Sequence, residues 1–443
     1  MNAGRGEFAT RLGFILAAAG SAIGLGNIWK FPYVAGQNGG GAFVIVYLIM
    51  VFSIGLSVML AEFAIGRAAQ RNPVGAFAKL KGGAWTGVGY LGVAAGFIIL
   101  SFYAVVGGWT LAYTVHTMGT LLETSDPKTL GAFFGEFTAD PGSSVFYHGL
   151  FLAMTMAIVI GGVEKGIERA SKFLMPVLLV LLVALCLRAV TLPGGGAGIA
   201  FFLTPDFSKI DIDTINAALG QAFFSLSLGM GALLTYGSYL SRQVHLTTAA
   251  LWVTSLDTSI ALLAGFLVLP AVFAFGYDPA AGPGLTFITL PAVFAQMPGG
   301  AFFGPLFFGL LSIAALTSAV SLLETAVAYF VDNRGLSRRK ATAWAGIIIF
   351  ALGIPSALSF GALSGQTVAG RTFFDLMDYL ASNVMLPLGG IAISVFAGWT
   401  IMDRIIDEIT ADGAHGFPAR TIWIWICRIA APLAITWILV SGL

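Results

Sequence analysis

The chain has 443 residues, of which 58% are apolar and only 10% are charged. Soluble proteins carry about 25% charged residues, so this composition excludes a soluble globular protein. The formal net charge of +1 argues against nucleic-acid binding, and the two cysteines, Cys186 and Cys427, both lie in apolar runs and provide no disulfide scaffold.

A helix that crosses a bilayer needs about 20 mainly apolar residues, and about eleven segments of the chain meet that requirement. They lie near 11–36, 42–66, 86–118, 145–163, 171–192, 213–240, 246–275, 301–331, 340–358, 372–402 and 420–441. Residues 278–300 are interrupted by Pro283, Pro291 and Pro298, which predicts a re-entrant or capping loop. The predicted fold class is an all-α polytopic membrane protein.

The basic residues predict how the chain is oriented, because lysine and arginine are retained on the cytoplasmic side. Most of them, among them Arg67, Arg169 and Arg338, fall on one side if the N-terminus is cytoplasmic. An odd number of spans then leaves the C-terminus outside. The first apolar run continues well past Ala19, which disfavours a cleaved signal peptide. We expect a multi-pass protein of the inner (plasma) membrane.

The first and sixth predicted spans contain small, flexible residues at mid-membrane, in the stretches 20–27 and 225–231. Backbone that leaves the helix there is tolerated only where it lines a cavity or is buried in protein. Two interrupted spans in corresponding places of two halves are typical of an inverted-repeat transporter, with sites for a carboxylate and for sodium at the breaks. Close helix packing through small residues is the alternative interpretation.

Four ionisable residues fall inside predicted spans, namely Lys30, Glu62, Asp257 and Glu324. A central charge costs at least about 2.5 kcal/mol, so each needs a partner. For Glu62 we expect backbone hydrogen bonds from an unwound segment. Asp257 also belongs to a set of oxygen-bearing residues in the predicted spans that contains no histidine or cysteine. Such a set favours a hard monovalent cation as ligand, although each member could also be a polar group in helix packing. Its members are Asn27, Ser225, Asp257, Thr317 and Ser318.

Several motifs along the chain resemble those of the neurotransmitter:sodium symporter family, in its bacterial amino-acid transporter branch. They are RLG at 11–13, GSAIGLGNIWKFP at 20–32, NGGGAF at 38–43, Glu62, GIER at 166–169, QAFFSLS at 221–227 and AALTS at 314–318. The resemblance covers nearly the whole chain, although the family's usual twelfth span is missing. It implies a five-plus-five inverted repeat with broken spans 1 and 6, divided into 1–192, 193–402 and an additional span in 403–443.

The resemblance also implies two sodium sites. The first would use the Ala22 carbonyl with Asn27, Ser225 and Asp257, and the substrate's carboxylate would complete it. The second would use the carbonyls of Gly20, Ile23 and Ala314 with the hydroxyls of Thr317 and Ser318.

An amino-acid substrate would lie at the breaks, according to the same resemblance. Its carboxylate would meet the Tyr103 hydroxyl and the amides of Leu25 and Gly26. Its ammonium group would face carbonyls of Ala22, Phe224, Ser225 and Ser227. The side-chain pocket would be formed by Ser21, Ile99, Phe224, Met230, Ser318 and Leu322. No charged residue belongs to this set, which favours a neutral, apolar or aromatic substrate.

Two gates and a hinge complete the expectations from the resemblance. Phe224 and Tyr103 would form a lid below an outer ion pair of Lys30 and Asp378, and Arg5 would pair with Asp332 on the cytoplasmic side. The spacing of Gly166 and Pro176 resembles the family's unwinding point in the fifth span, for which a plain proline kink is the alternative.

The predicted function is sodium-coupled import of a neutral, apolar or aromatic amino acid by alternating access, with two sodium ions. Asp257 could supply a fixed negative charge in place of chloride, which predicts chloride-independent transport. A carrier of the same fold for another small solute, such as an osmolyte or a nucleobase, is the alternative. No filter repeats of an ion channel and no HExxH motif of an enzyme occur. We expect no catalytic residues, nucleic-acid partner or obligate protein partner.

Overall fold

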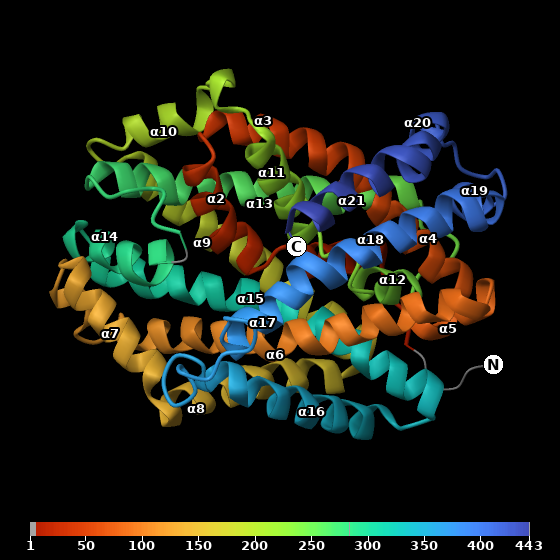
Figure 1. Cartoon of the computed structure of the whole chain (residues 1–443), viewed down its shortest axis with the longest axis horizontal. Helices are drawn as coiled ribbons and strands as arrows, with labels where there is room; N and C mark the ends of the chain where they lie inside the picture. Colours follow the sequence, from red (N-terminus) through yellow and green to blue (C-terminus); the bar gives the residue numbers. More distant parts are fainter. Residues whose placement is uncertain (1–5, 283, 443) are drawn as a thin grey trace.

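The computed structural model describes residues 6–282 and 284–442, and every named element in it is a helix. Figure 1 shows long helices running side by side along the longest axis of the molecule, with α6 (Thr86–His116), α15 (Gly300–Arg334) and α16 (Arg338–Leu358) in contact with one another. This arrangement agrees with the predicted all-α fold.

Nine helical stretches of the described chain are long and apolar enough to cross a membrane. They are Gly41–Ala69, Gly83–His116, Pro141–Ile160, Val163–Val190, Leu246–Ala274, Gly300–Arg334, Arg338–Leu358, Phe373–Thr400 and Arg420–Gly442. A tenth span consists of α1 (Arg11–Ala22) and the stretch Gly26–Gln37, which are bent by 51°. The remaining predicted span is divided between α11 (Ile212–Ser225) and α12 (Ala232–Gly237), each too short to cross alone.

The other helices either build these spans or connect them. Within the spans lie α2 (Phe31–Gln37), α3 (Gly41–Met50), α4 (Leu56–Ala69), α8 (Pro141–Ile160), α9 (Arg169–Val190), α13 (Leu246–Ala274), α17 (Phe373–Tyr379), α18 (Leu386–Val395), α20 (Arg420–Trp425) and α21 (Ala431–Gly442). The connections contain α5 (Pro73–Leu80), α7 (Pro127–Ala139), α10 (Gly196–Leu203), α14 (Leu290–Gln296) and α19 (Met402–Thr410). α14 lies in the predicted re-entrant stretch, and the helical segment Leu285–Gln296 is too short to span a membrane.

Both predicted breaks are present, and glycine makes the second one possible. The first span leaves the helix at Ile23, which is extended, and continues as a π-helical turn over Gly26–Lys30. In the sixth span Gly229 and Gly231 have φ values of +80° and +74°, a left-handed conformation that is costly for residues with a side chain. A Cβ atom on Gly229 would also lie 2.5 Å from the Leu386 carbonyl oxygen. Position 229 therefore requires glycine.

A carboxylate satisfies part of the backbone that the second break releases. Glu62 of α4 is fully buried, and its Oε1 accepts a hydrogen bond of 2.8 Å from the Gly229 N–H. The predicted role of Glu62 is thus confirmed. The bond replaces a helical partner that Gly229 lacks, because its own segment is unwound.

Candidate functional site

A buried polar cluster joins the two breaks to α13. The Asn27 side-chain amide donates to Ser225 Oγ (2.9 Å) and to Asp257 Oδ1 (2.7 Å), and Ser225 Oγ donates to Asp257 Oδ2 (2.9 Å). All three side chains are fully buried. The structure therefore brings together the side chains predicted for the first sodium site. The carboxylate and hydroxyl oxygens of Asp257 and Ser225 suit a hard cation, whereas Asn27 Oδ1 accepts a hydrogen bond from the Gly24 N–H (3.1 Å).

A second group of oxygen atoms lies where α1 ends against α15. Thr317 Oγ1 donates to the Ala314 carbonyl (3.0 Å) and lies 3.4 Å from the Ile23 carbonyl oxygen. Ser318 Oγ lies 3.4 Å from the Gly20 carbonyl oxygen and 3.3 Å from that of Ile23. All five residues predicted for the second sodium site thus lie together. Within the described ranges, no group of three His, Cys, Asp or Glu side chains is arranged for a different metal.

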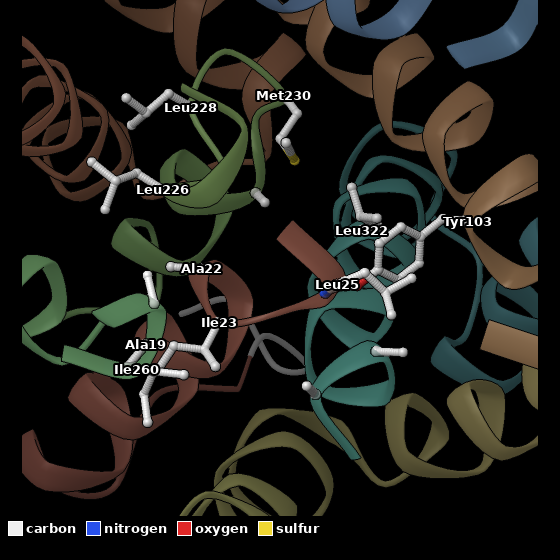
Figure 2. Packing of buried hydrophobic residues seen from close by; sticks show 14 of the residues in the cluster. Ala19, Ala22, Ile23, Leu25, Tyr103, Leu226, Leu228, Met230, Ile260 and Leu322 are labelled. Carbon is white, nitrogen blue, oxygen red and sulfur yellow. Dashed lines mark hydrogen bonds between the residues drawn. The ribbon is translucent and has the colours of Figure 1, made fainter. Parts of the chain in front are cut away.

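A small inner cavity of about 20 Å³ lies between the breaks and helices α6 and α15. It is lined by Ala22, Gly24, Gly26, Ile99, Tyr103, Phe224, Ser227, Met230, Ser318 and Leu322. Figure 2 shows the Tyr103 and Leu322 side chains lying next to Leu25, where the first span is unwound. A volume of this size holds about one water molecule, so the walls must separate before a larger molecule enters.

Three residues predicted to contact the substrate do not line this cavity. The Ser21 hydroxyl donates to Ser321 Oγ (2.7 Å), so its side chain is held by α15. The Leu25 N–H donates to the Tyr103 hydroxyl (3.1 Å), and Ser225 Oγ belongs to the polar cluster. For Ser21 the predicted place in the side-chain pocket is therefore not what the structure shows. A helix-packing hydrogen bond has taken that hydroxyl instead.

Sequence reasoning gave no role to Gly24, which the structure places in the cavity wall. A Cβ atom there would overlap Ser318 Oγ and would lie 2.7 Å from the Tyr103 hydroxyl oxygen. Gly26 is equally restricted, because its Cβ would lie 2.8 Å from the Phe224 ring. The glycine-rich motif signalled that something must approach the backbone closely, but not which side chains do so.

Phe224 separates the inner cavity from an outer cavity of about 440 Å³, since it lines both. The Lys30 ammonium lies 4.7 Å from the centre of the Phe224 ring, a cation–π contact. Asp378 accepts a hydrogen bond from Ser382 (2.9 Å). No ion pair within 4.0 Å joins Lys30 to Asp378 in the part of the chain that the structure describes. The two residues of the predicted outer gate therefore lie outside direct ion-pair distance in this structure.

For the predicted inner gate, the Arg5 partner of Asp332 lies outside the described residues. Asp332 Oδ2 accepts hydrogen bonds from the Asn72 backbone N–H (2.8 Å) and from the Asn72 side chain (3.1 Å). Phe8 packs edge-on against Tyr236, with ring centres 5.6 Å apart. Phe8 therefore packs against α12, the second half of the sixth span.

The predicted hinge in the fifth span is a widened turn, and the helix continues through it. Gly166 lies in a π-helical turn over Val163–Glu168, and Pro176 lies inside α9. This turn follows Gly162, whose φ of +87° ends the fourth span. The structure thus has a local irregularity at the predicted place without unwinding at Pro176.

Two interrupted membrane spans with groups of oxygen atoms beside the interruptions are typical of a secondary transporter. Comparisons with known proteins agree. The model of the sodium:neurotransmitter symporter family matches residues 5–127 and 138–443. The sodium-dependent transporter YhdH of Bacillus subtilis, itself uncharacterised, is 41% identical over 97% of this chain and 96% of its own length. The crystal structure of MhsT in complex with L-phenylalanine shares 48% identity and a TM-score of 0.91, covering 99% of this chain and 100% of that one.

A more distant relative is the sodium- and chloride-dependent taurine transporter of Canis lupus familiaris, 29% identical over 86% of this chain and 68% of its own length. The chain belongs to the sodium:neurotransmitter symporter family. It is a sodium-dependent symporter that crosses the membrane several times, and not an enzyme. The family and fold predicted from the sequence are confirmed.

Proposed function

We propose that this chain imports a neutral, apolar or aromatic amino acid together with two sodium ions. The observation that carries this proposal is the buried cluster of Asn27, Ser225 and Asp257 beside a cavity with uncharged walls. Ile99, Met230 and Leu322 would contact the substrate side chain. The similarity to MhsT, whose structure contains L-phenylalanine, supports the same substrate class.

In this proposal the substrate carboxylate meets the Leu25 and Gly26 amides and the Tyr103 hydroxyl, beside the first sodium ion. Its ammonium group faces the backbone carbonyls at the breaks. Because substrate and ion share a contact, each raises the affinity for the other by the same factor. Entry requires Phe224 to move, since this ring lies between the outer and inner cavities.

The remaining parts of the proposal concern topology. Residues 1–192 and 193–402 form the two inverted repeats, and 403–443 add the eleventh span. The N-terminus lies in the cytoplasm and the C-terminus outside, in the inner membrane. Figure 1 shows α21 beside α18, which it contacts.

Uptake of labelled leucine, tyrosine, tryptophan and alanine into proteoliposomes tests the proposal. We expect accumulation of at least one of them when an inward sodium gradient is present, and none when potassium replaces sodium. Labelled taurine and a nucleobase serve as the competing substrates. Sodium-driven uptake of either of these, without uptake of any of the four amino acids, would contradict the proposed substrate class.

We also expect uptake to continue when chloride is replaced by gluconate. Asp257 is buried within hydrogen-bond distance of Ser225, so its carboxylate places a fixed negative charge beside the proposed ion. Sodium-driven uptake in chloride and in gluconate should therefore agree within about twofold, since the balancing charge is already present. Loss of uptake in gluconate would show that Asp257 does not replace an anion.

A further inference from the structure

Two histidines from distant parts of the chain lie against each other in the structure. His245 directly precedes α13, and His415 lies in the connection 411–419, which joins α19 to α20 at one end of the molecule (Figure 1). Their ring centroids are 4.4 Å apart, and the ring planes are tilted by 30°. Aromatic rings at about this separation attract each other, but two imidazolium rings would repel, because both would carry a positive charge. The contact is therefore stable only while at least one ring is neutral.

The hydrogen-bond surroundings of both rings fit the neutral form. Nδ1 of His245 lies 2.8 Å from Thr247 Oγ1 and 3.2 Å from Thr248 Oγ1, so its lone pair can accept from these hydroxyl groups. Nδ1 of His415 is buried and has no hydrogen-bond partner among the described residues. A proton on both nitrogens of His415 would therefore bury an N–H group without an acceptor, which costs free energy.

Positive charges face His245 from several elements. Arg11 lies in the first turn of α1 and Arg67 in the last turn of α4. Burial lowers the pKa of His245, and the neighbouring His415, Arg11 and Arg67 lower it further. His245 is also the N-cap residue of α13, where the helix dipole disfavours a cation. The folded structure thus opposes protonation of this imidazole.

The acidic groups at the same junction are already paired with arginine. Glu408 of α19 binds Arg67 through Oε1 (2.6 Å) and Arg242 through Oε2 (3.0 Å). Asp412, at the start of the connection, binds Arg242 at 2.8 Å. A protonated His245 would have to compete with these guanidinium groups for a carboxylate, so neither acid offsets its charge.

We propose that the contact between His245 and His415 is an acid-sensitive latch that holds the connection 411–419 against the start of α13. At neutral pH the rings pack together and the latch is closed. When both rings carry a proton they repel, and the connection separates from α13. α19 stays in place, because Glu408 keeps its buried ion pair with Arg67. Acid thus releases the link between the eleventh span and the helix that carries Asp257. The latch involves neither the proposed sodium sites nor the proposed substrate.

Protons favour the open latch over a defined pH range. In the open form the pKa of His245 returns toward the ordinary value of about 6.5, whereas in the closed form it is lowered. The stability of the closed latch is therefore fully present above about pH 6.5 and falls as the pH decreases below that value. Each pH unit below it favours the open latch about tenfold, until His245 is protonated in the closed form as well.

Hydrogen exchange of the full-length protein in lipid nanodiscs, read by mass spectrometry at about pH 7.5 and about pH 5.5, tests the latch. After correction for the intrinsic effect of pH on amide exchange, we expect the amides of 411–417 to exchange about tenfold faster at the lower pH. Exchange in α6 should not change. In His245→Gln and His415→Gln the effect of pH on 411–417 should disappear, because glutamine does not titrate. The matched control is His116→Gln, at the end of α6, which should keep the tenfold effect.

A permanent charge at position 415 tests the latch at neutral pH. His415→Lys and His415→Gln both remove the ring, but only lysine is charged. At about pH 7.5 we expect exchange of 411–417 to be about tenfold faster in His415→Lys than in His415→Gln. Equal exchange in these two variants would overturn the latch. So would an effect of acid on 411–417 that is absent from the wild type, persists in both glutamine variants, or spreads over the whole chain.

Discussion

Replacing Asp257 with asparagine is expected to reduce sodium-driven uptake by roughly 100-fold or more, because hydrogen bonds to charged groups contribute about 1.5–3 kcal/mol each. Asp257 accepts such bonds from both Asn27 and Ser225 in a fully buried cluster. The variant also removes the only charge among these three side chains. A sodium ion in the site would then lose its counter-charge. Uptake of the transported amino acid into proteoliposomes, measured against external sodium concentration, provides the test.

The matched control for this variant is Asp407→Asn, which makes the same change on the exposed face of α19. We expect the control to transport at the wild-type rate. A single symmetric peak on size-exclusion chromatography would show that the Asp257 variant still folds. If a folded Asp257→Asn protein retained wild-type sodium dependence in gluconate, the first sodium site would not be at Asp257.

Gly24→Ala is expected to abolish transport, with uptake at least about 50-fold below wild type, because overpacking a tight site costs roughly 1–3 kcal/mol or more. The added methyl group would overlap Ser318 Oγ and lie 2.7 Å from the Tyr103 hydroxyl oxygen. Ser318 Oγ donates to the Ser21 carbonyl (2.9 Å) and the Tyr103 hydroxyl accepts from the Leu25 N–H (3.1 Å), so moving either group breaks a buried hydrogen bond. The same position also fixes the break that presents Leu25 and the backbone of the first span.

A glycine with free space around it provides the comparison. Gly309 lies in α15, the helix that carries Ser318, and nothing lies within 4 Å of its Cβ position. Gly309→Ala should therefore transport normally. Sodium-driven uptake by Gly24→Ala equal to that of Gly309→Ala would mean that the cavity walls adapt, and that Ser318 and Tyr103 are not held in fixed contact with the first span.

The membrane spans could be predicted from the sequence because each one is a property of its own segment. Lipid provides no hydrogen-bond partners, so about 20 apolar residues must form a helix whatever their neighbours are. The break in the sixth span could also be predicted from its own segment, because Gly229 and Gly231 adopt left-handed conformations that other residues avoid. The resemblance of the motifs predicted which residues would form the two sodium sites, and the structure places the side chains of each set close together.

Contacts between side chains of distant segments were decided only by the tertiary structure. Lys30 lies over Phe224 and forms no ion pair within 4.0 Å with Asp378, and the Ser21 hydroxyl is bonded to Ser321. Glu168 holds Ala9, a residue 159 positions away. The sequence by itself determined the membrane fold and the positions of the breaks, because bilayer thickness and backbone conformation act locally. The partner of each polar side chain depends on helix rotation and depth, which all neighbouring helices determine together.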